Sequence, residues 1–360
     1  MSGCLSERYR DELQKELPEV DLFTGVGDYH KIDELIANKS SDDVFLIEDE
    51  DRIVSGSSFH AYIKIAEGCN QSCSFCAIPS FKGKLHSRGL ESIIKEVKLL
   101  VKKGFKEFSF ISQDSSSYLL DMGIKDGLIK LIESVEKIEG VKKARILYLY
   151  PSTTSFELID KIGESDIFGT YYDIPLQHIS SKILKKMKRG VGQKKHIALL
   201  DRMKSKEDAF IRTTFILGHP GEDEDDFNEL KKFVEDFGFD RVNLFEYSPE
   251  EGTSAYKMRD KVDKTTISKR IKSLNKVVEK STKKSLEKLI NKEMEALLLG
   301  VSDEHEYFYE ARPLIFAPDI DGTILINDSE VKNIEFEQLY KILITEVIGS
   351  KAIGKIIYKC

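Results

Sequence analysis

One pattern of hydrophobic and polar positions repeats from about residue 59 to residue 247. Each time, a short apolar or β-branched run is followed by a longer amphipathic segment, which is typical of a strand and then a helix. The pattern predicts strands over residues 60–66, 107–112, 145–150, 171–174, 211–217 and 241–247. It predicts helices over residues 90–103, 127–137, 155–162, 181–188, 194–203 and 224–237. Parallel strands need crossover helices, so this succession indicates an α/β domain built as a partial TIM-type (β/α)6 barrel.

Residues 264–292 have a different pattern. They hold ten basic side chains against two glutamates, with apolar residues at helical spacing. This predicts a long basic helix that closes the barrel domain. The basic face is most simply a solvated surface opposite a packed stripe, and a dedicated RNA-binding helix is the alternative.

Residues 293–360 change character again and predict a small all-β barrel of the OB-like kind. Short strands are expected over residues 295–301, 308–310, 322–326, 341–347 and 352–358, with turn-prone residues between them. This part holds 13 acidic and 6 basic side chains. Phosphate contacts need Lys and Arg, so an acidic barrel indicates a basic protein partner instead.

These patterns divide the chain into three parts. Residues 1–54 look like the end of a domain followed by a linker, because a glycine-cysteine turn enters a helix with no strand before it. Residues 55–292 form the barrel domain, and residues 293–360 form the small barrel.

Composition changes this picture little. The chain has 360 residues, 41% hydrophobic and 32% charged, which is ordinary for a soluble globular protein. Its apolar runs are too short to cross a bilayer, so no membrane partner is expected. The net charge of −7 argues against a general polyanion binder.

The strongest chemical signal lies directly after the first predicted strand. Cys69, Cys73 and Cys76 have the spacing C-x3-C-x2-C. Three closely spaced thiolates can hold three irons of a cubane cluster and leave the fourth iron without a protein ligand. An open iron suits reductive cleavage of S-adenosylmethionine, because the amine and carboxylate of that cofactor can chelate it. Functional loops of such barrels follow the C-terminal ends of strands, which is where this motif lies.

A structural zinc site is the alternative, and it would make the chain a zinc-stabilised RNA- or protein-binding module. Structural zinc takes four ligands, usually as two separated pairs, but this chain has no second C-x2-C. Only His60 and His86 lie nearby, at unfamiliar spacings. A disulfide framework is disfavoured, because the cysteine number is odd and no signal peptide or hydrophobic span opens the chain. We therefore expect a reducing, cytoplasmic setting.

With these features in place, the chain resembles the radical-SAM methylthiotransferases along nearly its whole length, and within that family the RimO type. The segments that carry the resemblance are residues 66–70 (AEGCN), 112–116 (SQDSS) with Tyr118, 173–178 (DIPLQH), 187–190 (MKRG), 212–215 (RTTF), 247–252 (YSPEEG) and 317–322 (APDIDG). The transfer-RNA-modifying relatives usually carry Q-N-V where this chain has QDS at residues 113–115. A transfer-RNA methylthiotransferase of the same family is the alternative.

The resemblance implies an activity and its cofactors. The chain would add a methylthio group to the β-carbon of one aspartate in protein S twelve of the small ribosomal subunit. It would use a [4Fe–4S] cluster and S-adenosylmethionine, with an electron donor such as flavodoxin or ferredoxin. Nucleic acid is not expected as substrate, and the small barrel would be a TRAM domain. No catalytic side chain is expected beyond the cluster, because the cofactors carry the radical chemistry.

The chain departs from the family at its N-terminus. Family members carry a further N-terminal domain with three more cysteines that bind a second cluster. Only the last of these has a counterpart here, Cys4, which we expect to be a remnant ligand of that cluster. The chain as given looks N-terminally shortened. We therefore expect it to bind one cluster, whereas full-length members of the family bind two clusters. Without the second cluster, we expect this chain to lack methylthio transfer.

The resemblance also implies residues that bind S-adenosylmethionine. Phe75, directly before the last cysteine, would lie against the adenine, although loop packing is the simpler alternative. The turn after the fifth strand would let the backbone approach the adenine, since glycine removes the side-chain obstacle. The other candidates lie at the ends of three predicted strands: Ser112, Gln113, Gln177, Leu217, Gly218 and Glu222. Glu222 could equally stabilise the start of the next helix.

Two aspartates of the small barrel are the candidate partner contacts. Asp319 and Asp321 lie in the turn of residues 317–322, and we expect both to stand exposed beside the rim of the barrel. Exposed carboxylates there would attract a basic ribosomal protein and repel a phosphate backbone.

Overall fold

The computed structural model describes residues 1–26, 28, 52–303 and 306–360. Much of the linker expected within residues 1–54 therefore lies outside the described residues. In the part of the chain that is described, no helix is both long enough and apolar enough to cross a membrane.

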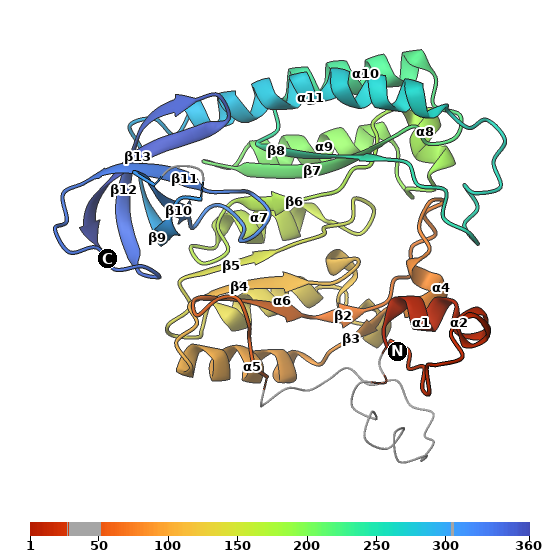
Figure 1. Cartoon of the computed structure of the whole chain (residues 1–360), viewed down its shortest axis with the longest axis horizontal. Helices are drawn as coiled ribbons and strands as arrows, with labels where there is room; N and C mark the ends of the chain where they lie inside the picture. Colours follow the sequence, from red (N-terminus) through yellow and green to blue (C-terminus); the bar gives the residue numbers. More distant parts are fainter. Residues whose placement is uncertain (27, 29–51, 304–305) are drawn as a thin grey trace.

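Six parallel strands form the wall of the larger domain (Figure 1). They pair in the orders β1-β4-β5 and β6-β7-β8, and β5 contacts β6 between the two groups. The strands are β1 (His60–Lys64), β4 (Glu107–Ile111), β5 (Lys143–Ile146), β6 (Tyr171–Asp173), β7 (Phe210–Leu217) and β8 (Arg241–Glu246). The outer strands of this order are β1 and β8, so the wall is an open, partial barrel. The expected fold is confirmed.

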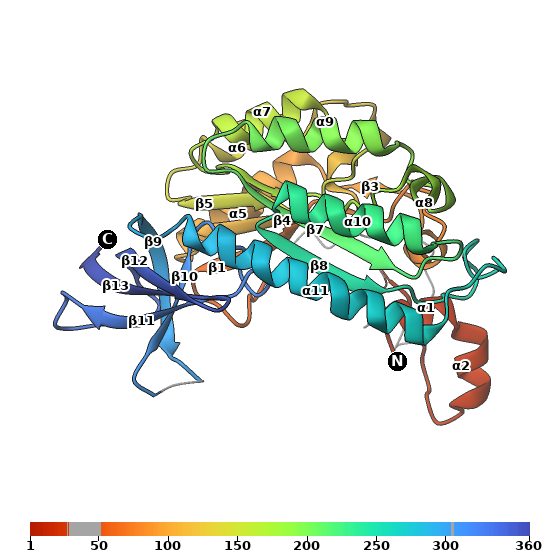
Figure 2. The same cartoon turned by 90° about the horizontal axis from the view of Figure 1, so that it is seen from above.

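Helices between the strands cover the outer side of the wall, as Figure 2 shows for α6, α7 and α9. Each amphipathic segment buries its apolar stripe against the strands; in α5 this stripe is Ile93, Val97 and Leu100. Three helix starts in the described residues are fixed by side-chain caps, at Ser155, Asp223 and Asp263. The helices are α5 (Leu90–Lys102), α6 (Gly127–Val135), α7 (Phe156–Glu164), α8 (Ser181–Lys186), α9 (Gln193–Lys204), α10 (Glu224–Phe237) and α11 (Lys264–Glu287).

Several short elements lie at the C-terminal ends of the strands. β2 pairs with β3 in an antiparallel ladder directly after β1. The elements are α1 (Cys4–Arg8), α2 (Arg10–Glu16), β2 (Ala66–Glu67), α4 (Ile78–Lys82), β3 (His86–Ser87), η2 (Ser115–Ser117) and η3 (Leu120–Met122).

The C-terminal part folds as the predicted small barrel. Its strands close in the order β10-β11-β13-β12-β9 around an apolar core that includes Ile324, Ile342 and Ile356, and this core continues into Tyr171 and Phe210 of the larger domain. The strands are β9 (Glu293–Val301), β10 (Tyr309–Pro313), β11 (Ile324–Ser329), β12 (Leu339–Ile348) and β13 (Lys351–Lys359).

The small barrel packs against the N-terminal ends of the larger domain's strands. Arg312 of β10 pairs with Glu107 at the start of β4, and Arg145 of β5 donates to Leu314 O at 2.9 Å. The Tyr171 hydroxyl, at the start of β6, donates to Asp321 Oδ2 at 2.8 Å. The barrel therefore lies at the end of the wall opposite α1 and α4, and Figure 1 shows this separation.

One strand ends earlier than the sequence predicts. The apolar run of residues 145–150 continues past β5, but pairing stops at Ile146. Tyr148 has a φ of 63°, a left-handed conformation that a strand cannot contain. Its backbone N–H donates to the side-chain Oδ2 of Asp173 in β6 at 2.9 Å instead of to a backbone carbonyl of a strand ladder. The run therefore leaves the sheet at the C-terminal ends of the strands, which we call the mouth of the wall.

Candidate functional site

The three cysteines lie on a loop that is tied closed at its base. The loop leaves β2 and returns in β3, and Cys69 N donates to Gly83 O at 3.1 Å. Gly68, with a φ of 75°, begins the loop, and a Cβ there would lie 2.1 Å from the carbonyl oxygen of Lys84. Only glycine fits this close approach. The loop therefore starts from a fixed backbone position at the C-terminal end of β1.

All three thiols are free and partly buried. Burial raises the pKa of Cys69 to about 11 and also raises the pKa of Cys76. Both groups are neutral at pH 7 on their own, because a thiolate is disfavoured away from water. A metal centre that binds the thiolates directly would supply the missing stabilisation.

The three thiols on one loop are a donor set that suits a cluster. Among the residues described, no three His, Cys, Asp or Glu side chains are grouped so that they could hold one metal ion. A structural zinc needs its ligands around one point, whereas a cubane binds each thiolate through a different iron. His60 lies at the start of β1 and contacts Ser109 at 2.9 Å, and His86 is exposed on β3. The donor set therefore suits three irons with one left open.

Cys73 has two polar neighbours from distant parts of the chain. Arg189 Nη1 donates to Cys73 Sγ at 3.3 Å, and the Tyr150 hydroxyl lies 3.3 Å from the same sulfur. The guanidinium stacks on the Tyr150 ring, 4.0 Å from its centroid. The sequence analysis did not predict that Arg189 or Tyr150 would belong to the site. The available signal for Arg189 was its place in the MKRG segment.

The segment after β4 is attached to the cysteine loop through Asp114. Asp114 Oδ2 accepts from Gln71 Nε2 at 2.8 Å and from Ser117 Oγ at 2.6 Å. Ser112 is buried, and its hydroxyl donates to Ser115 Oγ at 3.3 Å. Gln113 Nε2 donates to Glu67 Oε1 at 3.1 Å, while its own buried Oε1 has no partner in the structure described. Gln113 therefore lies beside the loop with one free acceptor.

The glycine turn after β7 has a different physical basis from the one expected. Leu217 ends β7 and is fully buried, and Gly218 follows with a φ of 81°. A Cβ on Gly218 would lie 2.3 Å from the Ile267 side chain of α11. Glycine is therefore required by the turn and by helix packing, whatever else approaches it.

Glu222 holds this turn together. It accepts from Gly218 N at 2.9 Å and pairs with Arg270 of α11 at 2.7 Å. Burial raises its pKa to about 7 in spite of the arginine. The helix that follows is capped by Asp223, so Glu222 acts on the turn more than on the helix dipole.

Phe75 lies against the same turn. Its ring contacts His219 edge-on with the centroids 6.4 Å apart, and Ser74 Oγ lies 2.9 Å from His219 Nε2. His219 also packs edge-on against Tyr247 at 5.5 Å. The cysteine loop and the turn of residues 218–222, which lie far apart in the sequence, are thus brought together.

Gln177 has an unusual backbone conformation. Its φ is 72°, which is uncommon for a residue with a side chain, and its buried Oε1 has no partner among the residues described. A bridge to Phe215 of β7 holds it in place. The neighbouring His178 is fully buried, accepts from Ser180 N at 3.0 Å, and has a pKa lowered to about 3 by burial. Gln177 is therefore a candidate contact at the mouth, whereas His178 belongs to the packing behind it.

Cys4 begins α1, which packs against α4 directly after the cysteine loop. It is exposed, and Arg8 in the same helix pairs with Glu250 at 2.9 Å. This end of the chain therefore lies at the same end of the wall as the loop. Membership of Cys4 in a second cluster stays a prediction.

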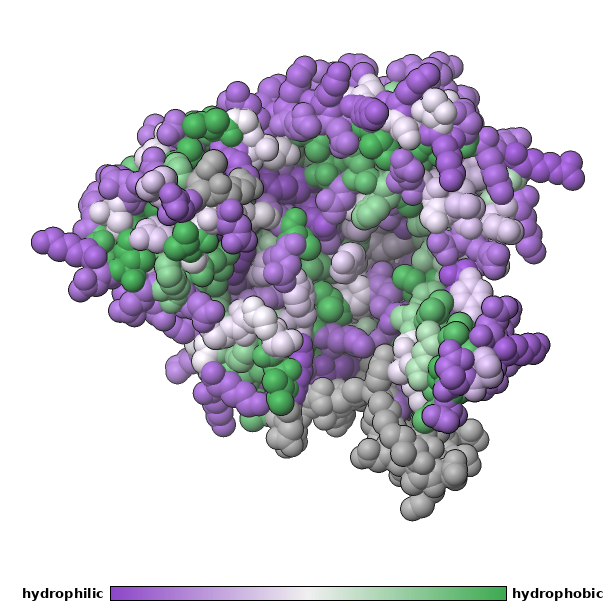
Figure 3. All heavy atoms as spheres, viewed as in Figure 1, coloured by the Kyte–Doolittle hydropathy of each residue, from purple (hydrophilic) through white to green (hydrophobic). Residues whose placement is uncertain are grey.

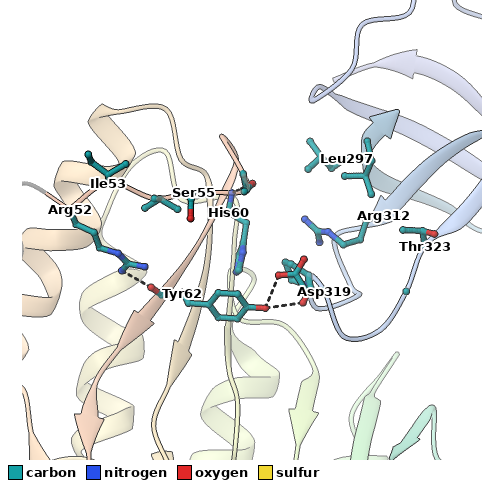
Figure 4. A pocket seen from close by; sticks show the side chains of 15 residues that line it. Arg52, Ile53, Ser55, His60, Tyr62, Leu297, Arg312, Asp319 and Thr323 are labelled. Carbon is teal, nitrogen blue, oxygen red and sulfur yellow. Dashed lines mark hydrogen bonds between the residues drawn. The ribbon is translucent and has the colours of Figure 1, made fainter. Parts of the chain in front are cut away.

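The two partner-binding aspartates lie between the domains, at the opposite end. Asp321 is buried, which makes the prediction of an exposed carboxylate wrong: it accepts from Tyr171 and from Ala317 N, each at 2.8 Å. Asp319 is exposed, but it accepts from the Tyr62 hydroxyl of β1 at 3.1 Å, as Figure 4 shows. The turn bends back onto the larger domain, where the buried Tyr171 hydroxyl needs an acceptor. Asp319 also borders a cavity of about 550 Å³ between the domains.

The face of the molecule in Figure 3 is hollowed at its centre, between the part that carries α10 and α11 and the part that carries α1 and α4. Mostly hydrophilic residues cover the outer rim of this face.

Comparisons with known proteins agree with this description. A sequence model of the radical SAM superfamily matches residues 63–234. The ribosomal protein uS12 methylthiotransferase RimO of Nitratiruptor sp. is 56% identical over 359 residues, covering 99% of this chain and 82% of that protein. The RimO proteins of Sulfurovum sp. and Campylobacter jejuni are 58% and 53% identical, covering 83% and 82% of those proteins and 100% of this chain.

Solved structures support the fold. Coproporphyrinogen III oxidase (HemN) of Escherichia coli, described as a radical SAM enzyme, matches with a TM-score of 0.50 and 14% identity, covering 62% of this chain and 53% of that one. The cobalamin-dependent S-adenosylmethionine radical enzyme OxsB matches with a TM-score of 0.51 and 13% identity, covering 78% of this chain and 43% of that one. At such identities the likeness concerns architecture only.

Proposed function

Because this chain belongs to the family of ribosomal protein uS12 methylthiotransferases, we propose that it is a radical-SAM enzyme that adds a methylthio group to the β-carbon of an aspartate of uS12. The observation that carries this proposal is the tied loop of Cys69, Cys73 and Cys76. It offers three free thiols on one loop, at the end of the wall where such barrels place their chemistry.

Cys69, Cys73 and Cys76 would hold the [4Fe–4S] cluster, and the fourth iron would be free to bind S-adenosylmethionine. When bound, the cluster and this cofactor supply the 5′-deoxyadenosyl radical that removes hydrogen from an unactivated carbon. The protein's task is to hold these groups and the substrate, because no side chain could deprotonate such a carbon at useful cost.

Three groups of residues would perform that task. The ties of the loop through Asp114 and Gly83 fix the positions of the thiols. The buried amide oxygens of Gln113 and Gln177, which have no partner among the described residues, would accept hydrogen bonds from the cofactor, since buried acceptors without partners are rare. Phe75 would pack against the adenine, next to the turn that begins at Gly218.

The substrate aspartate would enter at the C-terminal ends of the strands. The small barrel lies at the other end and holds Asp321 in its contact with the larger domain. We therefore place the uS12 contact at the mouth and on the hollowed face, away from the turn of residues 317–322. An electron donor such as flavodoxin or ferredoxin would reduce the cluster from the same side.

Anaerobic reconstitution tests the cluster site. The protein should take up about four irons and four sulfides per chain, and it should form 5′-deoxyadenosine when reduced with S-adenosylmethionine. Cys73→Ala should lose both properties. Cys360→Ala is the matched control, because that cysteine is exposed on the small barrel and should keep both.

Mass spectrometry of uS12 incubated with the full-length enzyme tests the substrate, with a methylthio group on aspartate as the expected product. Stoichiometric zinc with no deoxyadenosine would instead support the binding-module alternative. Methylthiolated transfer RNA with unmodified uS12 would support the other branch of the family.

A further inference from the structure

The guanidinium of Arg189 is buried beside the cysteine loop, and no acidic residue among those described pairs with it. In the structure described, Nη1 donates to Cys73 Sγ at 3.3 Å and Nη2 donates to Pro175 O at 2.6 Å, while the buried Nε has no partner. No carboxylate oxygen of the described residues lies within 4.0 Å of this group. Its hydrogen-bonded contacts are thus one carbonyl and one thiol.

The other buried arginines differ from Arg189. Each of them pairs with a buried carboxylate, as expected, because an uncompensated charge is costly to bury. These pairs are Arg88 with Glu96, Arg145 and Arg312 with Glu107, Arg212 with Asp173, and Arg270 with Glu222. Arg189 is the exception among the buried arginines of the described residues.

Arg189 is also held in one orientation. Its face lies on the Tyr150 ring at 4.0 Å, and Pro175 O fixes the far end of the fork. Tyr150 itself reaches Cys73, so two polar groups converge on the same sulfur. A guanidinium locked in this way points at the atom that would carry negative charge once it binds iron.

We propose that Arg189 is a positioning residue of the cluster site, which orients the Cys73 thiolate by a charged hydrogen bond and makes the bound cluster easier to reduce. The inference rests on the proposed cluster site. A cubane with three thiolates is net negative and becomes more so on reduction, so a buried cation beside it stabilises the reduced form. Hydrogen bonds to sulfur and local charge are among the factors that set the potential of such clusters.

A redox titration of the reconstituted protein, followed by EPR without S-adenosylmethionine, measures this effect apart from activity. In Arg189→Gln the midpoint potential should become more negative. The ratio of reduced to oxidised cluster at the wild-type midpoint should fall by about tenfold, which corresponds to about 59 mV for one electron. Lys188→Gln is the matched control, because it removes the same charge from the exposed neighbouring residue, and its midpoint should match the wild type.

Two further variants keep the test decisive if Arg189→Gln does not bind iron. Arg189→Lys retains the charge without the fork, and Tyr150→Phe removes only the second polar contact to Cys73. Both should bind iron with midpoints slightly more negative than the wild type. Wild-type midpoints in every iron-binding variant, or equal shifts in Arg189→Gln and Lys188→Gln, would overturn the inference. A wild-type protein that binds no cluster would instead overturn the proposed function.

Discussion

The two ends of the strand wall bury charged and polar groups in opposite ways. At the N-terminal end, Glu107 lies between Arg145 and Arg312, so each buried charge meets an opposite one. At the C-terminal end, Arg189 has no acidic partner in the described residues, and the amide oxygens of Gln113 and Gln177 lack hydrogen bonds there.

The pKa values of two buried carboxyl groups also differ between the ends, although both groups pair with arginine. The two arginines hold the pKa of Glu107 below its usual range despite complete burial, whereas burial raises the pKa of Glu222 to about 7. At the N-terminal end, the buried charges of Glu107, Arg145 and Arg312 compensate one another, and the contact holds the two domains together. The C-terminal end buries one arginine and two amide oxygens that lack such partners among the described residues. In barrels of this kind, the bottom face serves stability and the top face serves chemistry.

The largest expected effect is a loss of stability at the N-terminal end of the wall. Glu107→Gln keeps the shape of the side chain but leaves two buried guanidinium groups without their shared counter-ion. The free energy of unfolding should fall by about 3–5 kcal/mol in denaturant titrations. Glu133→Gln, on the exposed face of α6, should change it by less than about 0.5 kcal/mol. Equal stability of the two variants would show that the compensated cluster does not hold the domains together.

The next effect separates the two aspartates of the small barrel. Asp321→Ala should cost about 2–3 kcal/mol, because it leaves the Tyr171 hydroxyl and the amide of Ala317 without an acceptor. Asp319→Ala, at an exposed position, should cost less than about 1 kcal/mol. Neither change should affect iron uptake at the opposite end of the wall. Calorimetry and iron analysis on the two variants provide the measurement, and weaker uS12 binding in Asp319→Ala alone would restore the original assignment of that residue to the partner surface.

The smallest effect uses pH to compare the carboxyl groups. Glu222 has a raised folded pKa, so the stability it contributes is fully present below its unfolded pKa of about 4.5 and is lost as the pH rises through about 7. Relative to the wild type, Glu222→Gln should therefore gain about 2 kcal/mol between pH 5 and pH 8. Denaturant unfolding across that range measures the difference. A constant difference would mean that Arg270 keeps Glu222 ionised throughout.

For Glu107, the depressed pKa has the opposite sign. Its contribution is present above the unfolded pKa and disappears as the pH falls through the lower folded value. Wild-type protein should therefore lose stability on acidification over a range where Glu107→Gln does not.

Local patterns in the sequence determined the element order and the position of the chemical motif. The alternation of apolar runs and amphipathic segments placed every strand of the wall, because burying one face of each element imposes its period on the sequence. The cysteine spacing indicated a cluster for a similar reason: ligands on one short loop lie close together in any fold. The left-handed conformation of Tyr148 departs from the strand pattern, so β5 ends earlier than its apolar run predicts.

Only the tertiary structure decided which distant residues meet. Arg189 reaches Cys73 across 116 positions of sequence, and Tyr171 reaches Asp321 across 150. No periodicity encodes such pairs, because they depend on how whole strands and domains pack. The turn of residues 317–322 shows the consequence most clearly. Its carboxylates look exposed in sequence, but the packing of the small barrel on the N-terminal ends of the strands buries Asp321, where the Tyr171 hydroxyl and a backbone amide need an acceptor.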